Sequence, residues 1–315
     1  MTNIIIVSGF LGAGKTTLIR NILEGIHADE NTVVIENEFG EVSVDTDLLR
    51  DTRVEIKEMV SGCICCSLSG DFTKSIGEVV QTFQPAWIII EPSGVGKLSD
   101  VLLACEKASK VVPLQIKQAI TVIDCLKYLV YLRNFREFYL DQILHADVVY
   151  LRNAKGNAKQ HEVLASLQTI NPTAVLVDTP LADLTKGALW HQLDSLELLS
   201  GQLLRDLKVQ AAAKASFRNH AAEEVFQSWG VLLSSPFSEE QMRKILIILA
   251  EHGATHILRA KGIFQDEAGN GYQFSYVPGE WTVTSVSWQQ QPKVCVIGTA
   301  LNKQELETLF AVSHE

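Results

Sequence analysis

Short apolar runs alternate with helical stretches from the first residue to about residue 200 of this 315-residue chain. The runs have the length and the β-branched content of buried strands, and the stretches between them are long enough for crossover helices. The predicted strands span residues 4–7, 32–35, 86–90, 119–123, 148–151 and 174–177, with a further strand over 55–60 near an edge. Helices are predicted over 17–26, 98–107, 135–145 and 161–169. This pattern predicts a mainly parallel, doubly wound α/β sheet, whose ligands bind beyond the carboxyl ends of its strands.

The alternation ends at the polar segment 202–220, which has the composition of a linker or a solvated helix. Beyond it, the pattern predicts strands over 228–233, 255–264, 272–277, 281–287 and 294–299. A helix over 238–252 begins with a Ser238-x-x-Gln241 capping pattern, a last helix begins at Asn302, and the glycines in 266–271 indicate a hairpin turn. We therefore predict a larger α/β domain over 1–205 and a smaller α+β domain over 215–315, with the boundary near residue 210.

Composition narrows the class of protein. With 47% hydrophobic and 20% charged residues, the chain is globular, and its net charge of −10 argues against a general nucleic-acid or anionic-membrane surface. No apolar run reaches the roughly 18 residues of a membrane span, and the apolar start lacks the basic segment of a signal peptide. Three of the six cysteines crowd into residues 63–66, which suits a reducing compartment. We expect a cytoplasmic protein.

A phosphate-binding loop follows the first strand. Residues 8–17 read S-G-F-L-G-A-G-K-T-T, which contains G-x-x-x-x-G-K-T between a strand and a helix. Glycines let the backbone N–H groups wrap an anion, Lys15 reaches the β- and γ-phosphates, and the Thr16 hydroxyl ligates Mg²⁺. A chance glycine-rich turn would leave G-K-T-T unexplained. The residues expected to contact the nucleotide here are Gly9, Gly12, Ala13, Gly14, Lys15, Thr16 and Thr17.

A second motif ends the strand predicted over 86–90. The sequence W-I-I-I-E-P-S-G over 87–94 places Glu91 at the carboxyl end of an all-apolar strand, where a parallel sheet delivers it to the nucleotide pocket. A Mg²⁺ ion or its bound water is the natural partner of this charge, and Gly94 can present its backbone N–H to the γ-phosphate. The alternative is a carboxylate that only caps the turn before Pro92.

Candidate ligands for a second metal follow two other strands. Three carboxylates lie within the segment 36–41, E-N-E-F-G-E, and their mutual repulsion indicates either a bound cation or a mobile loop. The sequence G-C-I-C-C over 62–66 offers soft thiolates for Zn²⁺ or a similar ion, but these cannot complete a tetrahedral site alone. Glu36 or Glu41 can supply the missing ligand to Cys63, Cys65 and Cys66. Buried apolar cysteines or a redox disulfide remain alternatives for this cluster. Buried apolar roles suit the other three cysteines, Cys105, Cys125 and Cys295.

Together, the motifs G-F-L-G-A-G-K-T-T, E-N-E-F-G-E-V-S-V-D, S-G-C-I-C-C and E-P-S-G resemble those of the CobW-type P-loop GTPases, a metal-trafficking branch. The resemblance spans essentially the whole chain. It implies slow hydrolysis of GTP with Mg²⁺, and binding of Zn²⁺, Co²⁺, Ni²⁺ or a similar ion by a metallochaperone or metal-insertion factor that serves a client metalloprotein. When the family's motifs are placed on the matching positions of this chain, the resemblance implies that Glu91 and Gly94 form the second switch and that residues 36–45 form a switch-like acidic loop. The metal ligands expected first are Glu36, Glu41, Cys65 and Cys66.

One departure concerns the nucleotide base. The family usually reads guanine with an N-K-x-D-like sequence after a strand, and an ungapped alignment places R-N-A-K over 152–155 on that tetrad. The alignment keeps Asn153 at the base, but Lys155 replaces the aspartate and can only donate hydrogen bonds. Either another residue reads the base or the preference for GTP is relaxed.

The leading hypothesis is a nucleoside triphosphatase, a slow GTPase, that couples nucleotide state to the capture and delivery of a transition metal. Its predicted catalytic residues are Lys15, Thr16 and Glu91. The alternative is a non-hydrolysing module that binds nucleotide and metal with relaxed base specificity. A small-molecule kinase ranks last, because it gives no reason for C-x-C-C. The smaller domain shows no catalytic cluster, and an interaction role suits it.

Overall fold

The computed structural model describes residues 1–26, 30–37, 55–58, 70–183, 188, 190, 221–252, 256–287 and 291–310. These residues form two compact units, the first made of the described residues up to 190 and the second of those from 221 onward. The predicted domain boundary near residue 210 and the linker 202–220 lie outside the described residues.

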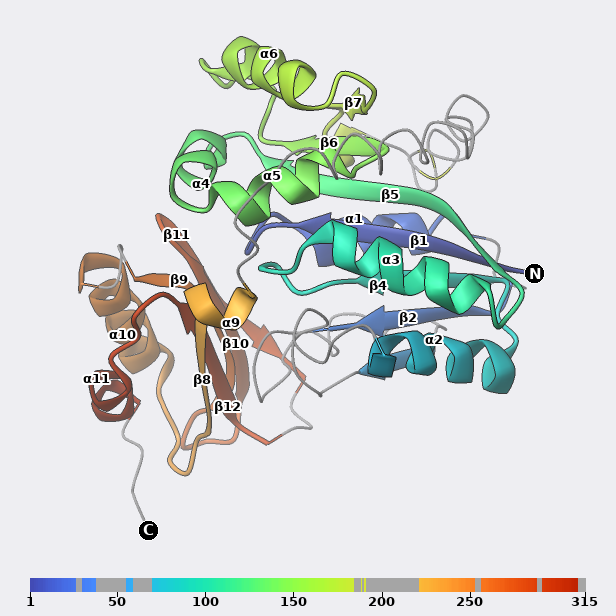
Figure 1. The fold of residues 1–315 in the computed structure, drawn as a ribbon. Helices are drawn as coiled ribbons and strands as arrows, with labels where there is room; N and C mark the ends of the chain where they lie inside the picture. Colours follow the sequence, from blue (N-terminus) through green and yellow to red (C-terminus); the bar gives the residue numbers. More distant parts are fainter. Residues whose placement is uncertain are drawn as a thin grey trace. The chain divides into compact units, whose positions relative to one another are not determined.

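The first unit contains a seven-stranded sheet in the order β3-β2-β4-β1-β5-β6-β7, with all neighbouring strands parallel (Figure 1). The predicted α/β class is confirmed, and the strand predicted near an edge is the edge strand β3. The strands are β1 (Thr2–Gly9), β2 (Thr32–Glu36), β3 (Glu55–Glu58), β4 (Trp87–Glu91), β5 (Leu114–Asp124), β6 (Val148–Arg152) and β7 (Val175–Val177). The helices are α1 (Lys15–Leu23), α2 (Gly70–Phe83), α3 (Leu98–Ser109), α4 (Tyr128–Asn134), α5 (Arg136–Leu144) and α6 (Gln160–Ile170), followed by a 3₁₀ turn, η2 (Leu181–Asp183).

Helices cover both faces of this sheet. Ile5 and Val7 of β1 pack in one core cluster with apolar side chains of α1, while the alternating residues Ile4 and Ile6, which are fully buried, point to the other face. Helix α3 lies along that second face in Figure 1. A parallel sheet that is covered on both sides needs continuous apolar strands, which is why its strands are prominent in the sequence.

The second unit is a five-stranded antiparallel sheet in the order β11-β10-β9-β12-β8, with two longer helices. The predicted turn over 266–271 joins β9 to β10, and Asp266 accepts hydrogen bonds from the backbone N–H groups of Ala268 and Asn270. The smaller α+β architecture is confirmed. Its elements are α9 (Ala222–Val225), β8 (Gln227–Leu232), α10 (Glu239–His252), β9 (Ile257–Gln265), β10 (Gly271–Val277), β11 (Glu280–Val286), β12 (Lys293–Gly298) and α11 (Lys303–Leu309).

Both predicted helix starts in this unit are confirmed by their caps. The Ser238 hydroxyl accepts the backbone N–H of Gln241 at 3.1 Å, and the Gln241 side chain accepts the N–H of Ser238 at 2.7 Å, which is a reciprocal capping box. The Asn302 side chain accepts the N–H of Glu305 at 3.3 Å. Polar side chains at these two positions therefore satisfy amide groups that a helix start leaves without partners.

Three helices were not predicted, namely α2, α4 and the four-residue α9. Helix α2 contains Gly70 and Gly77 and several β-branched residues, which have weak helix propensity, and it is stabilised by packing against α3. Helix α4 has only seven residues and buries Tyr128 and Tyr131. Helix α2 nevertheless carries an apolar period, with Phe72, Ile76, Val79 and Val80 buried at helical spacing, so its sequence did contain the signal of a helix. The shorter α4 and α9 have too few residues to show such a period, and tertiary contacts decide them.

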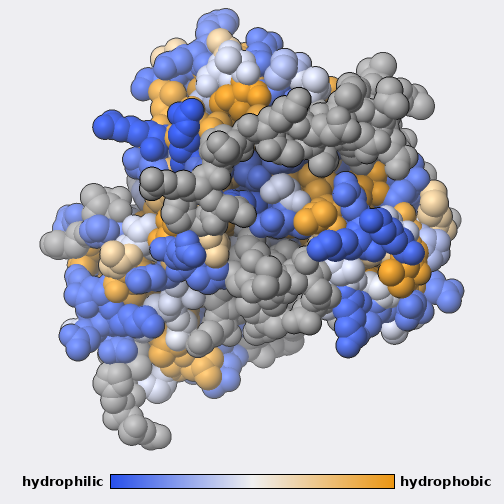
Figure 2. Space-filling model, in the orientation of Figure 1, coloured by the Kyte–Doolittle hydropathy of each residue, from blue (hydrophilic) through white to orange (hydrophobic). Residues whose placement is uncertain are grey.

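Large hydrophobic side chains are exposed at several positions among the described residues. On the face seen in Figure 2, hydrophobic areas are small and separated by hydrophilic side chains. Within the described parts of the chain, no helix has the length and apolar character to cross a membrane. The most exposed large hydrophobic residues are Met1, Leu103, Val111, Leu126, Val130, Leu232 and Ile247.

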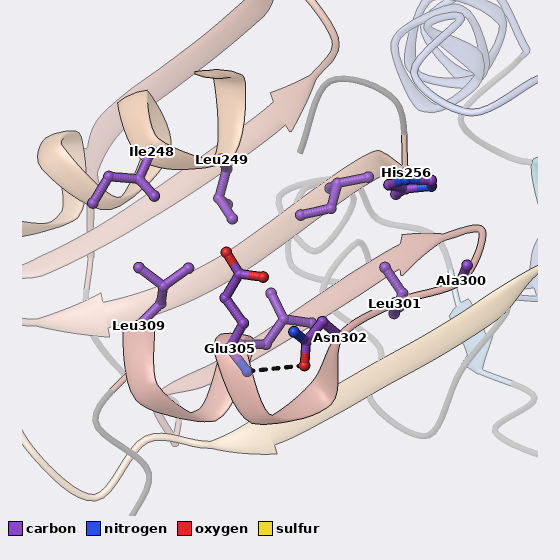
Figure 3. Close-up of a pocket in the computed structure, with 10 residues that line it drawn as sticks. Ile248, Leu249, His256, Ala300, Leu301, Asn302, Glu305 and Leu309 are labelled. Carbon is purple, nitrogen blue, oxygen red and sulfur yellow. Dashed lines mark hydrogen bonds between the residues drawn. The ribbon is translucent and has the colours of Figure 1, made fainter. Parts of the chain in front are cut away.

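A pocket of about 80 Å³ lies in the second unit, between α10, the start of β9 and α11. Leu249 and Leu309 face its interior, His256 lies at one end, and Asn302 bonds to the backbone of Glu305 at its floor (Figure 3). Sites for drug-sized ligands and cofactors usually measure several hundred Å³, roughly 300–1,000 Å³. This pocket is therefore too small to hold a nucleotide.

Candidate nucleotide-binding site

The phosphate loop begins where β1 ends. Gly9 has φ of 147°, and a Cβ atom there would lie 2.6 Å from the carbonyl oxygen of Val122 on the neighbouring strand β5. Gly12 and Gly14 also have positive φ, of 70° and 104°. Glycine at these positions lets the chain turn sharply into α1, whose N-cap residue Gly14 provides no side-chain hydrogen bond. The first amides of α1 therefore face a site suited to an anion.

An aromatic cluster anchors the first half of this loop. The Phe10 side chain is fully buried, and its ring centroid lies 4.7 Å from that of Tyr131, 5.1 Å from that of Phe135 and 5.8 Å from that of Tyr139. Rings packed in this way contribute both apolar burial and edge-to-face attraction. The loop is thus held from the side of α4 and α5 while its second half enters α1.

Lys15, Thr16 and Glu91 meet at the carboxyl end of the sheet. The Thr16 hydroxyl donates to the Glu91 carboxylate, with oxygen distances of 3.1 and 3.2 Å, and the Lys15 ammonium lies 3.8 Å from the same carboxylate. The Lys15 and Glu91 side chains are only 6% and 9% exposed. Oxygen ligands suit Mg²⁺, and a buried ammonium beside a helix N-terminus suits phosphate. These side chains fit a nucleoside triphosphate with Mg²⁺.

The turn after β4 packs directly on the phosphate loop. A Cβ atom on Gly94 would lie 2.9 Å from both the backbone nitrogen and the Cα of Leu11, so only glycine fits this approach. The turn is closed by a hydrogen bond of 3.0 Å from the N–H of Gly96 to the carbonyl of Ser93. Gly94, which we expect at the γ-phosphate, thus lies beside the loop expected to hold the other phosphates.

Glu36 lies beside Glu91 in the sheet. Strands β2 and β4 pair in parallel with these two residues in register, and the backbone of Glu58 on β3 is in register with Glu36 on the other side. The Glu36 side chain is buried, and the N–H of Asn37 donates to the carbonyl of Glu91 at 2.9 Å. The start of the acidic segment is therefore fixed to the strand that carries Glu91.

The predicted transition-metal site is described only in part. Glu36 is the one member among the described residues, whereas Glu41, Cys63, Cys65 and Cys66 lie outside them. Within the described parts of the chain, no group of three or more histidine, cysteine, aspartate or glutamate residues has the arrangement of a metal site. The transition-metal site stays a prediction.

The end of β6 also reaches the phosphate loop. The Arg152 guanidinium donates to the carbonyl of Gly12 at 3.4 Å and lies 3.8 Å from the Asp124 carboxylate. Asn153 is exposed, has φ of 57°, and donates from its side chain to Asp124 at 3.1 Å. Lys155, which replaces the family aspartate, forms an ion pair of 3.0 Å with Asp183 of η2, and both side chains are at least half exposed.

Two polar residues of this site were missed by the sequence reasoning. Asp124 ends the apolar strand β5 as Glu91 ends β4, so the same signal was present in the sequence. Gln142 lies within α5 and donates to the carbonyl of Gly96 in the turn after β4 at 2.8 Å, and no local pattern marks it. Burial and the nearby negative charge of Asp124 raise the pKa of the Cys125 thiol to about 11. That thiol is therefore protonated at neutral pH, unlike a metal-binding or nucleophilic cysteine.

A parallel sheet with a phosphate loop after β1, and an acidic residue at the end of β4 facing the loop lysine and threonine, defines the P-loop nucleotide-binding class. Residues 3–177 match the family model "CobW/HypB/UreG, nucleotide-binding domain", and residues 226–313 match "Cobalamin synthesis protein cobW C-terminal domain". The first match covers more than half of the chain, so the protein belongs to the CobW/HypB/UreG family. The resemblance inferred from the four motifs is confirmed.

Several individual proteins are similar to this chain. "Zinc chaperone YjiA" from Escherichia coli is 25% identical over 326 aligned positions, which cover 97% of this chain and 96% of that protein. "Zinc chaperone CobW" from Sinorhizobium sp is 34% identical over 126 positions, but these cover only 38% of this chain and 35% of that protein. Among solved structures, Zn(II)-bound YjiA GTPase from E. coli matches with a TM-score of 0.45 and 20% identity, covering 100% of this chain and 99% of that one.

Proposed function

We propose that this protein is a nucleoside triphosphatase, a slow GTPase, whose nucleotide state controls the binding and delivery of a transition metal, with Zn²⁺ the first candidate and Co²⁺ or Ni²⁺ the others. One observation carries the proposal: Lys15 and Thr16 face Glu91, and Glu91 lies in register with Glu36. The zinc chaperones among the relatives support the choice of metal.

In this proposal the chain's own groups bind and orient the triphosphate. The Lys15 ammonium and the first amides of α1 stabilise the negative charge that develops on the phosphoryl oxygens. Thr16 and Glu91 would hold Mg²⁺, which supplies further neutralisation of phosphate charge when bound. The burial of Lys15 and Glu91 lowers the local dielectric, so each of these interactions is stronger than it would be in water.

The link to the transition metal runs through the end of β2. The hydrogen bond from Asn37 to the Glu91 carbonyl joins this strand end to the residue beside Thr16. A shift of Glu91 on γ-phosphate binding is therefore passed to Glu36 and to the acidic segment that follows it in the sequence. We propose that this segment and the thiolates of 63–66 bind the metal and release it to a client metalloprotein.

Calorimetry of the two ligands tests this coupling. With saturating Zn²⁺, the affinity for a non-hydrolysable GTP analogue is expected to change by at least about fivefold, the lower end of ordinary coupling between two sites. Reciprocity requires the analogue to change Zn²⁺ affinity by the same factor. Titrations in both orders provide the internal control. Equal analogue affinities with and without zinc would rule out the coupling.

The Lys155–Asp183 ion pair favours the relaxed base specificity of the alternative function. Guanine presents its ring N–H and exocyclic amine as donors, and an ammonium cannot accept either one. Lys155 is 77% exposed on its side chain and is engaged with Asp183. We therefore expect the wild-type protein to discriminate weakly between GTP and ATP.

Restoring a carboxylate at this position tests the assignment. Lys155→Asp is expected to raise the ratio of GTP affinity to ATP affinity about tenfold or more, because the donors of the guanine edge regain an acceptor. Binding is measured with both nucleotides. Lys159→Asp is the matched control, since Lys159 is also exposed in the same loop and the charge change is identical. A ratio that moves equally in both variants would show a general charge effect and contradict the assignment.

A further inference from the structure

Helix α5 contacts both loops that are expected to hold the triphosphate. Tyr139 and the preceding Phe135 pack against Phe10 of the phosphate loop. One turn further along, the Gln142 side chain reaches the turn after Glu91. One rigid element therefore fixes two loops that are far apart in the sequence.

The contact made by Gln142 is specific. Its side-chain nitrogen donates to the carbonyl of Gly96 at 2.8 Å and to the carbonyl of Gly94 at 3.4 Å. These two carbonyls lie on either side of Val95, so a single amide holds both ends of the turn. Gly94 packs against Leu11 so closely that a Cβ atom would overlap its backbone. The amide thus holds the turn against the phosphate loop.

Neighbouring polar contacts secure the same segment to α5. Asp141 accepts hydrogen bonds from the backbone N–H and the hydroxyl of Ser99, at 3.0 and 2.7 Å. The Lys97 ammonium lies 2.7 Å from the Glu137 carboxylate, and both side chains are less than one-fifth exposed. The segment from Gly94 to Ser99 is therefore tied to α5 at three positions.

Gln142 is not placed there for packing alone. Its side chain is fully buried, and its Oε1 accepts no hydrogen bond from any residue that the structure describes. Burying an amide oxygen without a donor costs stability, and a leucine of similar size would avoid that cost. Unlike a leucine, the glutamine donates a pair of hydrogen bonds to the turn 93–96.

We propose that Gln142 is a positioning residue that holds the turn 93–96 against the phosphate loop, so that the site selects a triphosphate over a diphosphate. The inference rests on the proposed function and on the expectation from the sequence that the Gly94 N–H contacts the γ-phosphate. Contacts to the other phosphates come from the phosphate loop and α1, to which the Gln142 side chain donates no hydrogen bond in the described structure. Loss of the Gln142 amide therefore weakens triphosphate binding selectively.

Titration with two nucleotides tests this role. Gln142→Leu removes the donor at similar volume, and Gln142→Asn, the milder change, shortens the amide so that it cannot span both carbonyls. Each variant is titrated with GDP and with a non-hydrolysable GTP analogue, and its folding is checked by thermal denaturation. Affinity for the analogue is expected to fall about tenfold, and affinity for GDP to stay within about twofold, as one or two lost hydrogen bonds predict.

Asn171→Leu is the matched control. The buried Asn171 amide donates to the carbonyls of Ile143, Leu144 and Ala146 at the carboxyl end of α5, the end that also carries Gln142, but it makes no hydrogen bond to the turn 93–96 in the described structure, so its loss should lower stability without changing nucleotide selectivity. Equal losses for both nucleotides in the Gln142 variants, or no loss, would overturn the positioning role. If selectivity falls but the wild type releases no phosphate from GTP, the positioning role stands and the proposed hydrolysis fails. If the wild type binds neither nucleotide, both fail.

Discussion

Lys15→Ala is expected to reduce steady-state phosphate release from GTP by at least about 100-fold, the usual cost of removing one group that stabilises transition-state charge. The effect is large because the Lys15 ammonium is buried beside Glu91, where water cannot replace it. Free phosphate released by the purified wild type and variant, with Mg²⁺ present, measures the change directly.

Lys74→Ala is the control for this experiment. Lys74 is 77% exposed on α2 and pairs only loosely with Glu78, at 3.9 Å, so its loss removes the same charge without touching the phosphate loop. The control should hydrolyse GTP at the wild-type rate. Equal, background-level rates in the wild type and in Lys15→Ala would instead support the non-hydrolysing nucleotide- and metal-binding module.

Cys65→Ser is expected to abolish stoichiometric Zn²⁺ binding, with a loss of zinc affinity of at least about 100-fold. Replacing a residue that only supports a metal ligand already lowers metal affinity by up to about 100-fold, and Cys65 is expected to be a ligand itself. A serine hydroxyl is a poor substitute for a thiolate, which is a soft ligand that Zn²⁺ prefers. Binding is measured by competition with a chelating zinc indicator, with and without the GTP analogue.

The matched control is Cys105→Ala. The Cys105 thiol is fully buried in α3, and burial, followed by the charge of Glu106, raises its pKa far above the ordinary value for a cysteine. It is therefore a small apolar side chain, and zinc binding should survive its replacement. If Cys65→Ser keeps one zinc per chain, the metal site lies elsewhere.

Much of the fold follows from local patterns. The strands β1 and β4 and the second half of β5 contain continuous apolar runs because both faces of a parallel sheet are buried, and this makes them visible in the sequence. β5 begins earlier than predicted, at Leu114, because Gln115 and Lys117 interrupt the apolar run. The Gln115 side chain bonds to Asn3 on β1 at 3.0 Å, a tertiary contact that no local pattern reveals.

In the candidate site, too, some residues could be predicted from local patterns and others could not. Lys15, Thr16 and Glu91 were predicted because each stands at a fixed place in a short motif, and the sheet topology brings the ends of β1 and β4 together. The role of Gln142 could not be predicted, because its partners lie 46 and 48 positions away in the sequence. The number of residues between the phosphate loop and the turn after Glu91 does not indicate which helix packs against both of them.

The sequence by itself determined the class of the protein: a phosphate loop after a buried strand, an acidic residue at the end of another strand, and a smaller α+β second unit with capped helices. These features depend on neighbouring residues, whose chemistry is fixed by the order of the chain. Only the tertiary structure decided that Glu36 lies in register with Glu91, that Lys155 pairs with Asp183, and that α5 joins two nucleotide loops. Strand order, register and helix packing arise from contacts between distant segments, so they are settled when the chain folds.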